Sequence, residues 1–305
     1  MPAPKKSKFA LRSRQAWPAW AAVAFGWVIA RLPVPMVFRL GRALGAMAYR
    51  LSPSRRHIAE VNIRRCFPEL DDAARTQMVK TNFQHTMLGA LEAMLPWLNP
   101  RRDLSPWVDV RGVDHYEAAR DAGRGVLVLA AHFTTMDVIS QPLARLGTFD
   151  VMYRYNKHPV WEWLQVTGRK RYFEGVVERQ DTRQVLKRLK AGRSIWYAAD
   201  QDYGAKHSVF APFFGIQAAS ITATARFARL NRSPVVFMLT SRDLAAGRWR
   251  IEFKPAIEDF PSGDDVEDAT RINALLEAEI RQQPEQYLWV HKRFKTRPDG
   301  EPSFY

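Results

Sequence analysis

Residues 125–137, GVLVLAAHFTTMD, deliver a histidine and a carboxylate from an apolar run that is typical of a buried strand. His132 precedes Asp137 by five positions, and on one continuous helix that spacing separates two side chains by about 140°. We therefore expect a strand to end at His132 and a helix to begin directly after it, with Thr134 as its N-cap, so that Asp137 folds back toward the imidazole. A carboxylate on one ring nitrogen leaves the other nitrogen able to accept a proton from a hydroxyl. The pattern indicates a general base that activates an alcohol.

The same two residues also have a structural interpretation. A histidine at a strand end can be satisfied by neighbouring backbone groups, and Asp137 can be the acid of a capping box. Short patterns of this kind recur by chance, so the spacing alone leaves both interpretations open.

Charged residues follow two further apolar segments. Arg154 ends the next expected strand, where an arginine can hold a phosphate or an oxyanion bidentately. Asp200 and Asp202 follow another expected strand and can order a loop, orient a basic residue or bind a sugar hydroxyl. A surface arginine and a structural turn are the alternatives.

The segment from residue 284 onward interleaves aromatic and basic side chains. Its bases are Lys292, Arg293, Lys295 and Arg297. This mixture suits contact with lipid headgroup phosphates, and the alternative is a solvated basic tail.

Positioning these residues requires strands that end at a common edge. Strand candidates recur at 107–111, 125–131, 149–153, 194–199, 234–240 and 249–253. Helical patterns lie at 36–51, 54–66, 70–95, 114–122, 135–146, 159–171, 181–191, 219–231 and 265–282. The alternation predicts an α/β fold with a mostly parallel sheet flanked by helices, in which chemistry gathers at the carboxyl ends of strands. We expect a basic N-terminus and apolar membrane anchor at 1–35, and an α/β domain at 36–305 with a helical base at 36–100 and a catalytic core at 101–305.

Composition narrows the classes of site and partner. A single cysteine, Cys66, excludes an internal disulfide framework, and the seven scattered histidines form no HExxH pattern, so we expect no bound metal. The net charge of +15 is concentrated at the N-terminus, where residues 1–65 carry 13 basic residues and one acid. The other 240 residues carry 33 basic and 30 acidic groups. This distribution favours anionic membrane lipid and argues against nucleic acid.

Residues 17–30, WPAWAAVAFGWVIA, form the most apolar stretch of the chain. They are fewer than the ~20 residues that a straight membrane-spanning helix needs. Basic residues flank the stretch on both sides: Lys5, Lys6, Lys8, Arg12 and Arg14 before it, and Arg39, Arg42 and Arg50 after it. We expect an interfacial or shallowly inserted anchor with the body on the cytoplasmic side. A signal peptide and an ordinary core helix are the alternatives.

Seven segments in order resemble the late acyltransferases of lipid A biosynthesis, the lauroyl/myristoyl transferase family within the lysophospholipid acyltransferase group. They are NIRRCFPEL at 62–70, HFTTMD at 132–137, YRYNKHP at 153–159, WLQVTGR at 163–169, YAADQDYG at 197–204, VFAPFFG at 209–215 and PEQYLWVHKRFKTRP at 284–298. The second contains the H-x4-D/E motif that defines the group. One position departs from the commoner pattern, since the carboxylate is often Glu and here is Asp137.

The resemblance implies a glycerolipid-acyltransferase-like fold and a reaction. A fatty acyl group would pass from an acyl carrier protein thioester to a 3-hydroxyl on an acyl chain of a lipid A precursor, with His132 as the base and Asp137 orienting its ring. Arg154 would stabilise an oxyanion or a phosphate, and Asp200, Asp202 and Arg293 would contact or position substrate. No metal or redox cofactor is implied.

The resemblance also implies partners and a location. The expected partners are acyl carrier protein, the lipid A precursor and inner-membrane lipids, with the catalytic domain facing the cytoplasm and no nucleic acid bound. The alternatives are acylation of a lysophospholipid or ornithine lipid, and a binding protein without turnover.

Overall fold

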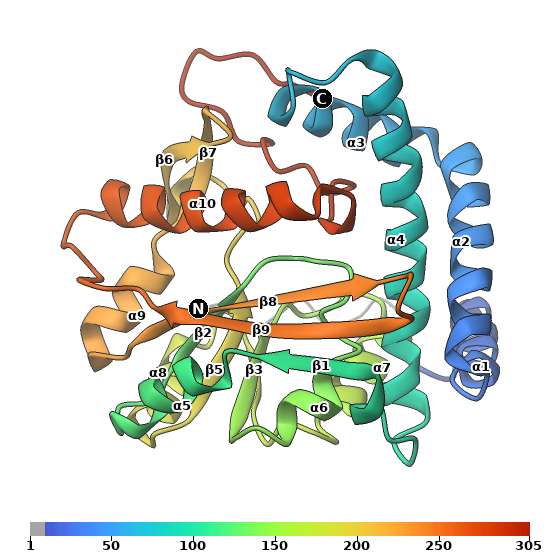
Figure 1. The fold of residues 1–305 in the computed structure, drawn as a ribbon, viewed down its shortest axis with the longest axis horizontal. Coiled ribbons are helices and arrows are strands. Elements are labelled where there is room, and N and C mark those ends of the chain that lie inside the picture. Colours follow the sequence, from blue (N-terminus) through green and yellow to red (C-terminus); the bar gives the residue numbers. More distant parts are fainter. Residues whose placement is uncertain (1–9) are drawn as a thin grey trace.

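Seven strands form the central sheet of the computed structural model, which describes residues 10–305 (Figure 1). Their order across the sheet is β1-β9-β8-β2-β5-β3-β4. They are β1 (Val108–Arg111), β2 (Leu127–Ala130), β3 (Phe149–Tyr153), β4 (Val176–Glu178), β5 (Ser194–Ala198), β8 (Val235–Asp243) and β9 (Arg248–Ala256). Strands β8, β2, β5, β3 and β4 are parallel neighbours, whereas β9 runs antiparallel to β8. The predicted mostly parallel sheet is confirmed.

Over residues 10–305, four α-helices precede the first strand, and six more alternate with the strands, so that helices cover both faces of the sheet. They are α1 (Trp17–Ile29), α2 (Val34–Leu51), α3 (Pro53–Cys66), α4 (Asp72–Leu98), α5 (Val113–Asp121), α6 (Ser140–Ala144), α7 (Pro159–Arg169), α8 (Thr182–Lys190), α9 (Ala223–Asn231) and α10 (Asp265–Gln282). In Figure 1 the long helices α2 and α4 run side by side at one edge of the molecule, where they pack on each other.

Strand β2 is buried along its whole length because helices lie on either side of it. Leu127 and Leu129 pack with side chains of α8, α9 and α10. The alternate residues Val128 and Ala130 pack with side chains of α2, α5 and α6. Successive strand side chains point to opposite faces, so an uninterrupted apolar run is what a central strand requires.

Three strands fall outside the predicted set. The short β4 carries only three residues. Strands β6 (Ser208–Phe213) and β7 (Ile216–Ile221) form a separate antiparallel hairpin. Its two loop residues, Phe214 and Gly215, have φ of 53° and 70°. Two consecutive positive φ values match the tight turn that fits the twist of a hairpin.

Three predicted helices have limits that differ from those of the structure. Helix α4 continues past Pro96 to Leu98, because a proline in the last turn removes only one backbone donor. Helix α9 begins at Ala223 and not at residue 219, because residues 219–221 belong to strand β7. The helix predicted at 135–146 shortens to α6, with turns over the preceding residues.

Helix α1 packs against α4 and α7 through Ala19, Val23 and Trp97. Its outer side chains Trp17 and Trp27 are 66% and 50% exposed. Within residues 10–305, no helix is both long enough and apolar enough to cross a membrane. Three bases of the expected flanking cluster lie outside the described residues: Lys5, Lys6 and Lys8.

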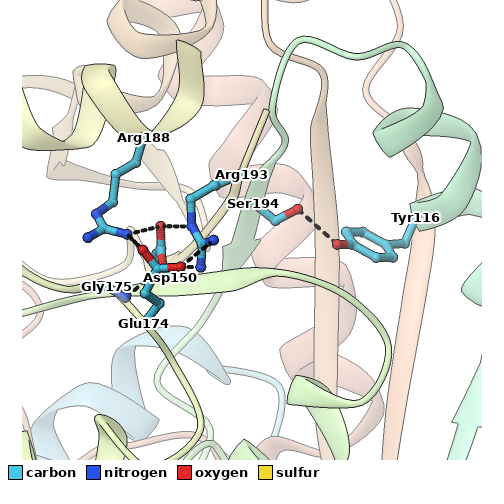
Figure 2. A network of polar contacts seen from close by, with 7 residues as sticks. All are labelled: Tyr116, Asp150, Glu174, Gly175, Arg188, Arg193 and Ser194. Carbon is cyan, nitrogen blue, oxygen red and sulfur yellow. Dashed lines mark hydrogen bonds and ion pairs between the residues drawn. The ribbon is translucent and has the colours of Figure 1, made fainter. Parts of the chain in front are cut away.

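A buried carboxylate holds the far edge of the sheet together (Figure 2). Asp150 on β3 is fully buried and accepts hydrogen bonds from Arg193 at 2.6 and 2.7 Å, from Arg188 at 3.1 Å and from the Gly175 amide at 2.7 Å. Glu174 adds ion pairs to both arginines. The two arginine charges are therefore compensated by two carboxylates.

Replacing Asp150 with alanine is expected to lower the free energy of unfolding by about 3–5 kcal/mol, because two half-buried arginines lose their central partner. Urea denaturation measures this change. Asp109→Ala is the control: Asp109 is more exposed and pairs with Arg111 and Arg250, so its loss should cost ~1 kcal/mol or less. Equal effects of the two substitutions would contradict a stabilising role for the buried network.

Candidate active site

His132 and Asp200 meet at the carboxyl ends of two neighbouring strands. Strands β2 and β5 pair in register with Ala130 opposite Ala198, and each functional residue stands two positions beyond its strand. His132 Nδ1 lies 2.6 Å from Asp200 Oδ1, and the His132 amide donates to Oδ2 at 3.0 Å. One carboxylate therefore fixes both the ring and the backbone of the histidine.

Asp200 is suited to remain a carboxylate. Its side chain is 1% exposed, and burial alone would raise its pKa. The charge of His132 and the hydrogen bonds from His132 and the Tyr287 hydroxyl outweigh that effect and hold the pKa of Asp200 well below its usual range. An ionised acceptor at Nδ1 places the ring proton there and leaves the lone pair on Nε2. Within residues 10–305, no side chain or backbone group is bonded to Nε2.

The expected contact of Asp137 with the His132 ring gives way to a contact with Arg169. Residues 134–139 form turns and not the first turn of a helix, so Asp137 does not fold back as expected. Its Oδ1 accepts from Arg169 Nη2 at 2.7 Å and from Nε at 3.1 Å. Arg169 ends helix α7, and both side chains are largely buried at the cavity wall. Asp137 thus holds an arginine at the wall of a cavity that His132 also lines.

A cavity of about 580 Å³ opens in front of these groups. His132, Asp137 and Arg169 form part of its polar wall. Its apolar wall comes largely from α4, α7 and the turn after β2, and includes Met94, Trp97, Met136 and Trp161. The space therefore offers an imidazole nitrogen at the margin of an apolar chamber, which suits a ligand with a long apolar part.

The segment 284–291 closes the site from behind. Leu288 donates its amide to the His132 carbonyl at 3.0 Å, and the Thr134 amide donates to Gln286 at 2.9 Å. Tyr287 contributes its hydroxyl to Asp200. These contacts give the first part of the 284–298 motif a supporting role at the imidazole, whereas the sequence predicted headgroup or substrate contact for the basic residues that follow it.

Two buried asparagines fasten that segment to the helical layer. Asn82 on α4 donates to the carbonyls of Glu285 and Tyr287 at 2.9 and 2.6 Å. Asn62 on α3 donates to the carbonyls of Trp289 and His291 at 2.7 and 2.8 Å. Both side chains are fully buried. The sequence motif at 62–70 contains Asn62, but its spacing gives no indication of a partner 227 residues away.

The other expected site residues separate into two groups. Arg154 lines the cavity and is exposed. Asp202 accepts from the Thr296 amide and hydroxyl at 2.6 and 2.8 Å, which ties down the C-terminal segment. Arg293 is 2% exposed and donates to the Ala219 carbonyl on β7 at 2.8 Å. Asp202 and Arg293 are not among the residues that line the cavity, and their observed contacts are structural.

A second buried ion pair supports the turn that carries His132. Arg242 binds Glu92 through two nitrogens, and both side chains are inaccessible to solvent. Arg242 Nη1 also lies 2.6 Å from His85 Nδ1 and 3.4 Å from Thr134 Oγ1. Burial, followed by the charges of Arg242 and Arg42, lowers the pKa of His85 to about 3. His85 is therefore neutral in the folded protein at ordinary pH.

This neutral histidine makes stability depend on pH. The pKa of His85 is 6.5 in the unfolded chain. Below that pH the unfolded chain binds a proton at His85 and the folded protein does not, so the free energy of unfolding falls as the pH falls toward 3. On acidification from pH 6.5 to pH 5, His85 lowers the free energy of unfolding by about 2 kcal/mol. His85→Gln keeps an acceptor for Arg242 but cannot titrate, so it should lose less stability on acidification. Urea unfolding at the two pH values tests this, and equal losses in both proteins would contradict the assignment.

Comparisons with known proteins place the chain in a family. The chain is 36% identical to the lipid A biosynthesis lauroyltransferase of Escherichia coli K12, over 99% of each chain. It is 33% identical to the palmitoleoyltransferase of the same organism, over 95% of this chain and 94% of the relative. It is 31% identical to the lipid A biosynthesis myristoyltransferase of Escherichia coli K12, over 93% of this chain and 89% of the relative. The family profile described as bacterial lipid A biosynthesis acyltransferase matches residues 4–296. The chain belongs to the bacterial lipid A biosynthesis acyltransferase family.

Proposed function

We propose that the protein transfers a fatty acyl group from an acyl carrier protein thioester to the 3-hydroxyl of an acyl chain on a lipid A precursor. The observation that carries this proposal is the pairing of His132 with buried Asp200 at the mouth of an apolar cavity. Membership of an acyltransferase family supplies the reaction class. The excess of positive charge on the chain favours encounter with an acidic donor protein.

The proposed mechanism uses one general base and no covalent acyl-enzyme. His132 Nε2 takes the proton of the acceptor hydroxyl, and the oxygen attacks the thioester carbonyl. Collapse of the tetrahedral intermediate breaks the C–S bond, and the imidazolium returns its proton to the leaving thiolate. Asp200 holds the ring and stabilises its charged form throughout.

Arg169 is the proposed electrostatic partner of the developing oxyanion. Its guanidinium lies at the cavity wall and is oriented by two hydrogen bonds to Asp137. A donor held in place before the reaction stabilises charge that appears only in the transition state. In this assignment Asp137 acts through Arg169 and is a positioning residue.

We also propose that α1 and α2 rest on the inner membrane, with the body on the cytoplasmic side. Large apolar side chains are exposed along these helices: Trp17, Phe25, Trp27 and Val28 on α1, and Met36, Met47 and Leu51 on α2. Helix α1 contacts α4 and α7, which form the apolar wall of the cavity. A lipid chain could then enter the cavity with little exposure to water.

The central test is mass spectrometry of lipid A precursor incubated with purified protein and a series of acyl carrier protein thioesters. Wild type should add the mass of one acyl chain. His132→Ala should abolish the addition, and Asp200→Asn should lower kcat by about 10³–10⁴-fold because the ring loses its ionised partner. Transfer by His132→Ala at the wild-type rate, with an intact fold, would overturn the general base.

Asp137→Asn provides the matched comparison for the second carboxylate. Because Asp137 acts through Arg169, the double variant Asp137→Asn/Arg169→Gln should be no slower than Arg169→Gln alone. If the rate losses of the two single variants multiply in the double variant, Asp137 has a role that is independent of Arg169. If wild type modifies no lipid A precursor, lysophospholipid and ornithine-lipid acceptors are assayed next, and transfer to one of them would replace the proposed acceptor.

Membrane seating is tested by flotation of the protein with vesicles that contain anionic lipid. The double variant Phe25→Ser/Trp27→Ser removes two half-exposed apolar side chains and should reduce the bound fraction several-fold. Leu230→Ser on α9 is the control, since Leu230 is at least as exposed, at 58%, but lies on a different helix. Equal binding by the double variant and wild type would remove this surface from the proposal.

A further inference from the structure

Two arginines stand side by side at the carboxyl ends of β3 and β4. These strands pair in parallel with Tyr153 opposite Glu178, so the next residues, Arg154 and Arg179, occupy adjacent positions. The Arg179 amide donates to the Tyr153 carbonyl at 2.8 Å, which extends the pairing to this point. In-register neighbours of a parallel pair point to the same face. Both side chains line the cavity that contains His132.

Neither guanidinium has a carboxylate partner among residues 10–305. Arg154 and Arg179 differ in this from other largely buried arginines that each pair with a carboxylate: Arg169, Arg188, Arg193 and Arg242. The nearby acid Glu162 accepts instead from the Tyr153 hydroxyl and the Asn156 amide. Figure 2 shows the contrasting case around Asp150 on β3, where Arg188 and Arg193 share two carboxylates.

Arg179 is held ready for a ligand. Its guanidinium carbon lies 4.0 Å from the centre of the Tyr203 ring, and this stacking fixes the plane of the group. Its Nη1 is shielded from solvent and has no hydrogen-bond partner in the described part of the chain. A shielded donor without a partner is costly, and an anion in the cavity would satisfy it.

We infer that Arg154 and Arg179 form a subsite for a phosphate group carried by one of the substrates. The inference rests on the proposed function, because it places that phosphate in the cavity where His132 acts. Paired arginine forks match the oxygens of a phosphate, and the cavity wall contains three arginines against one carboxylate, Asp137. The phosphate can belong to the sugar headgroup of the acceptor or to the phosphodiester of the donor's pantetheine arm.

Binding to the His132→Ala protein, measured by calorimetry, tests the subsite without turnover. One pair of ligands is detergent-dispersed lipid A precursor with and without its phosphates. The other pair is acyl-phosphopantetheine and acyl-pantetheine. For the substrate that uses the subsite, removing the phosphate and introducing Arg179→Gln should each weaken binding by about 10- to 100-fold. Combined, they should weaken it no further, since they remove the same contact.

Matched variants test whether the loss of binding comes from the paired guanidinium groups. Arg154→Gln should behave as Arg179→Gln does, whereas Arg179→Lys keeps the charge but loses the fork and should give an intermediate effect. Arg183→Gln on α8 makes the same charge change at an exposed position that does not line the cavity, and should leave binding unchanged. An Arg179→Gln penalty that is equal with and without phosphate in both ligand pairs would overturn the subsite.

The two proposals fail in different ways. If wild type transfers acyl groups but phosphate removal and Arg179→Gln act additively, only the subsite is wrong. If phosphate-dependent binding is present but mass spectrometry detects no transfer to lipid A precursor, the proposed reaction is wrong and the anion site remains.

Discussion

The site depends on one carboxylate held between two strands. Asp200 can bind both the imidazole and the amide of His132 because β2 and β5 are direct neighbours and both residues stand at the same offset from their strand ends. Because the side chain is buried, its negative charge is stable only while those donors remain in place. This mutual dependence links the chemistry of the imidazole to the register of the sheet.

Around this pair, the remaining parts of the site are arranged by other buried polar contacts. Asp137 orients Arg169, Gln286 exchanges hydrogen bonds with the Arg242 backbone, and Tyr287 supports Asp200. Each contact joins segments that are far apart in the chain. A rigid frame of this kind suits a reaction in which the protein contributes proton transfer and electrostatic stabilisation. The apolar cavity wall then contributes the binding of the lipid chain.

Local patterns were sufficient to predict the central strands and most helices, because a buried parallel strand requires an apolar run and each helix shows its own periodicity. They also placed His132 at a strand end. They could not predict which strands are neighbours, so the partner of His132 was assigned by proximity in sequence to Asp137. Asp200 was noted only as an acid at another strand end. Knowledge of the β2–β5 pairing would have identified it, since both residues lie two positions past paired alanines.

The asparagine clamps on α3 and α4 bear on how the chain acquires its structure. Asn82 and Asn62 bond to carbonyls 203 to 229 residues further along, so these buried amides have no native partner while most of the chain is still unfolded. Closing such long loops carries an entropic cost that local contacts do not, and topologies rich in them fold slowly. Docking of segment 284–291 on the helical layer therefore requires these long loops to close before the asparagine hydrogen bonds can form. While that segment is undocked, the His132 carbonyl lacks the Leu288 amide and the Asp200 carboxylate lacks the Tyr287 hydroxyl.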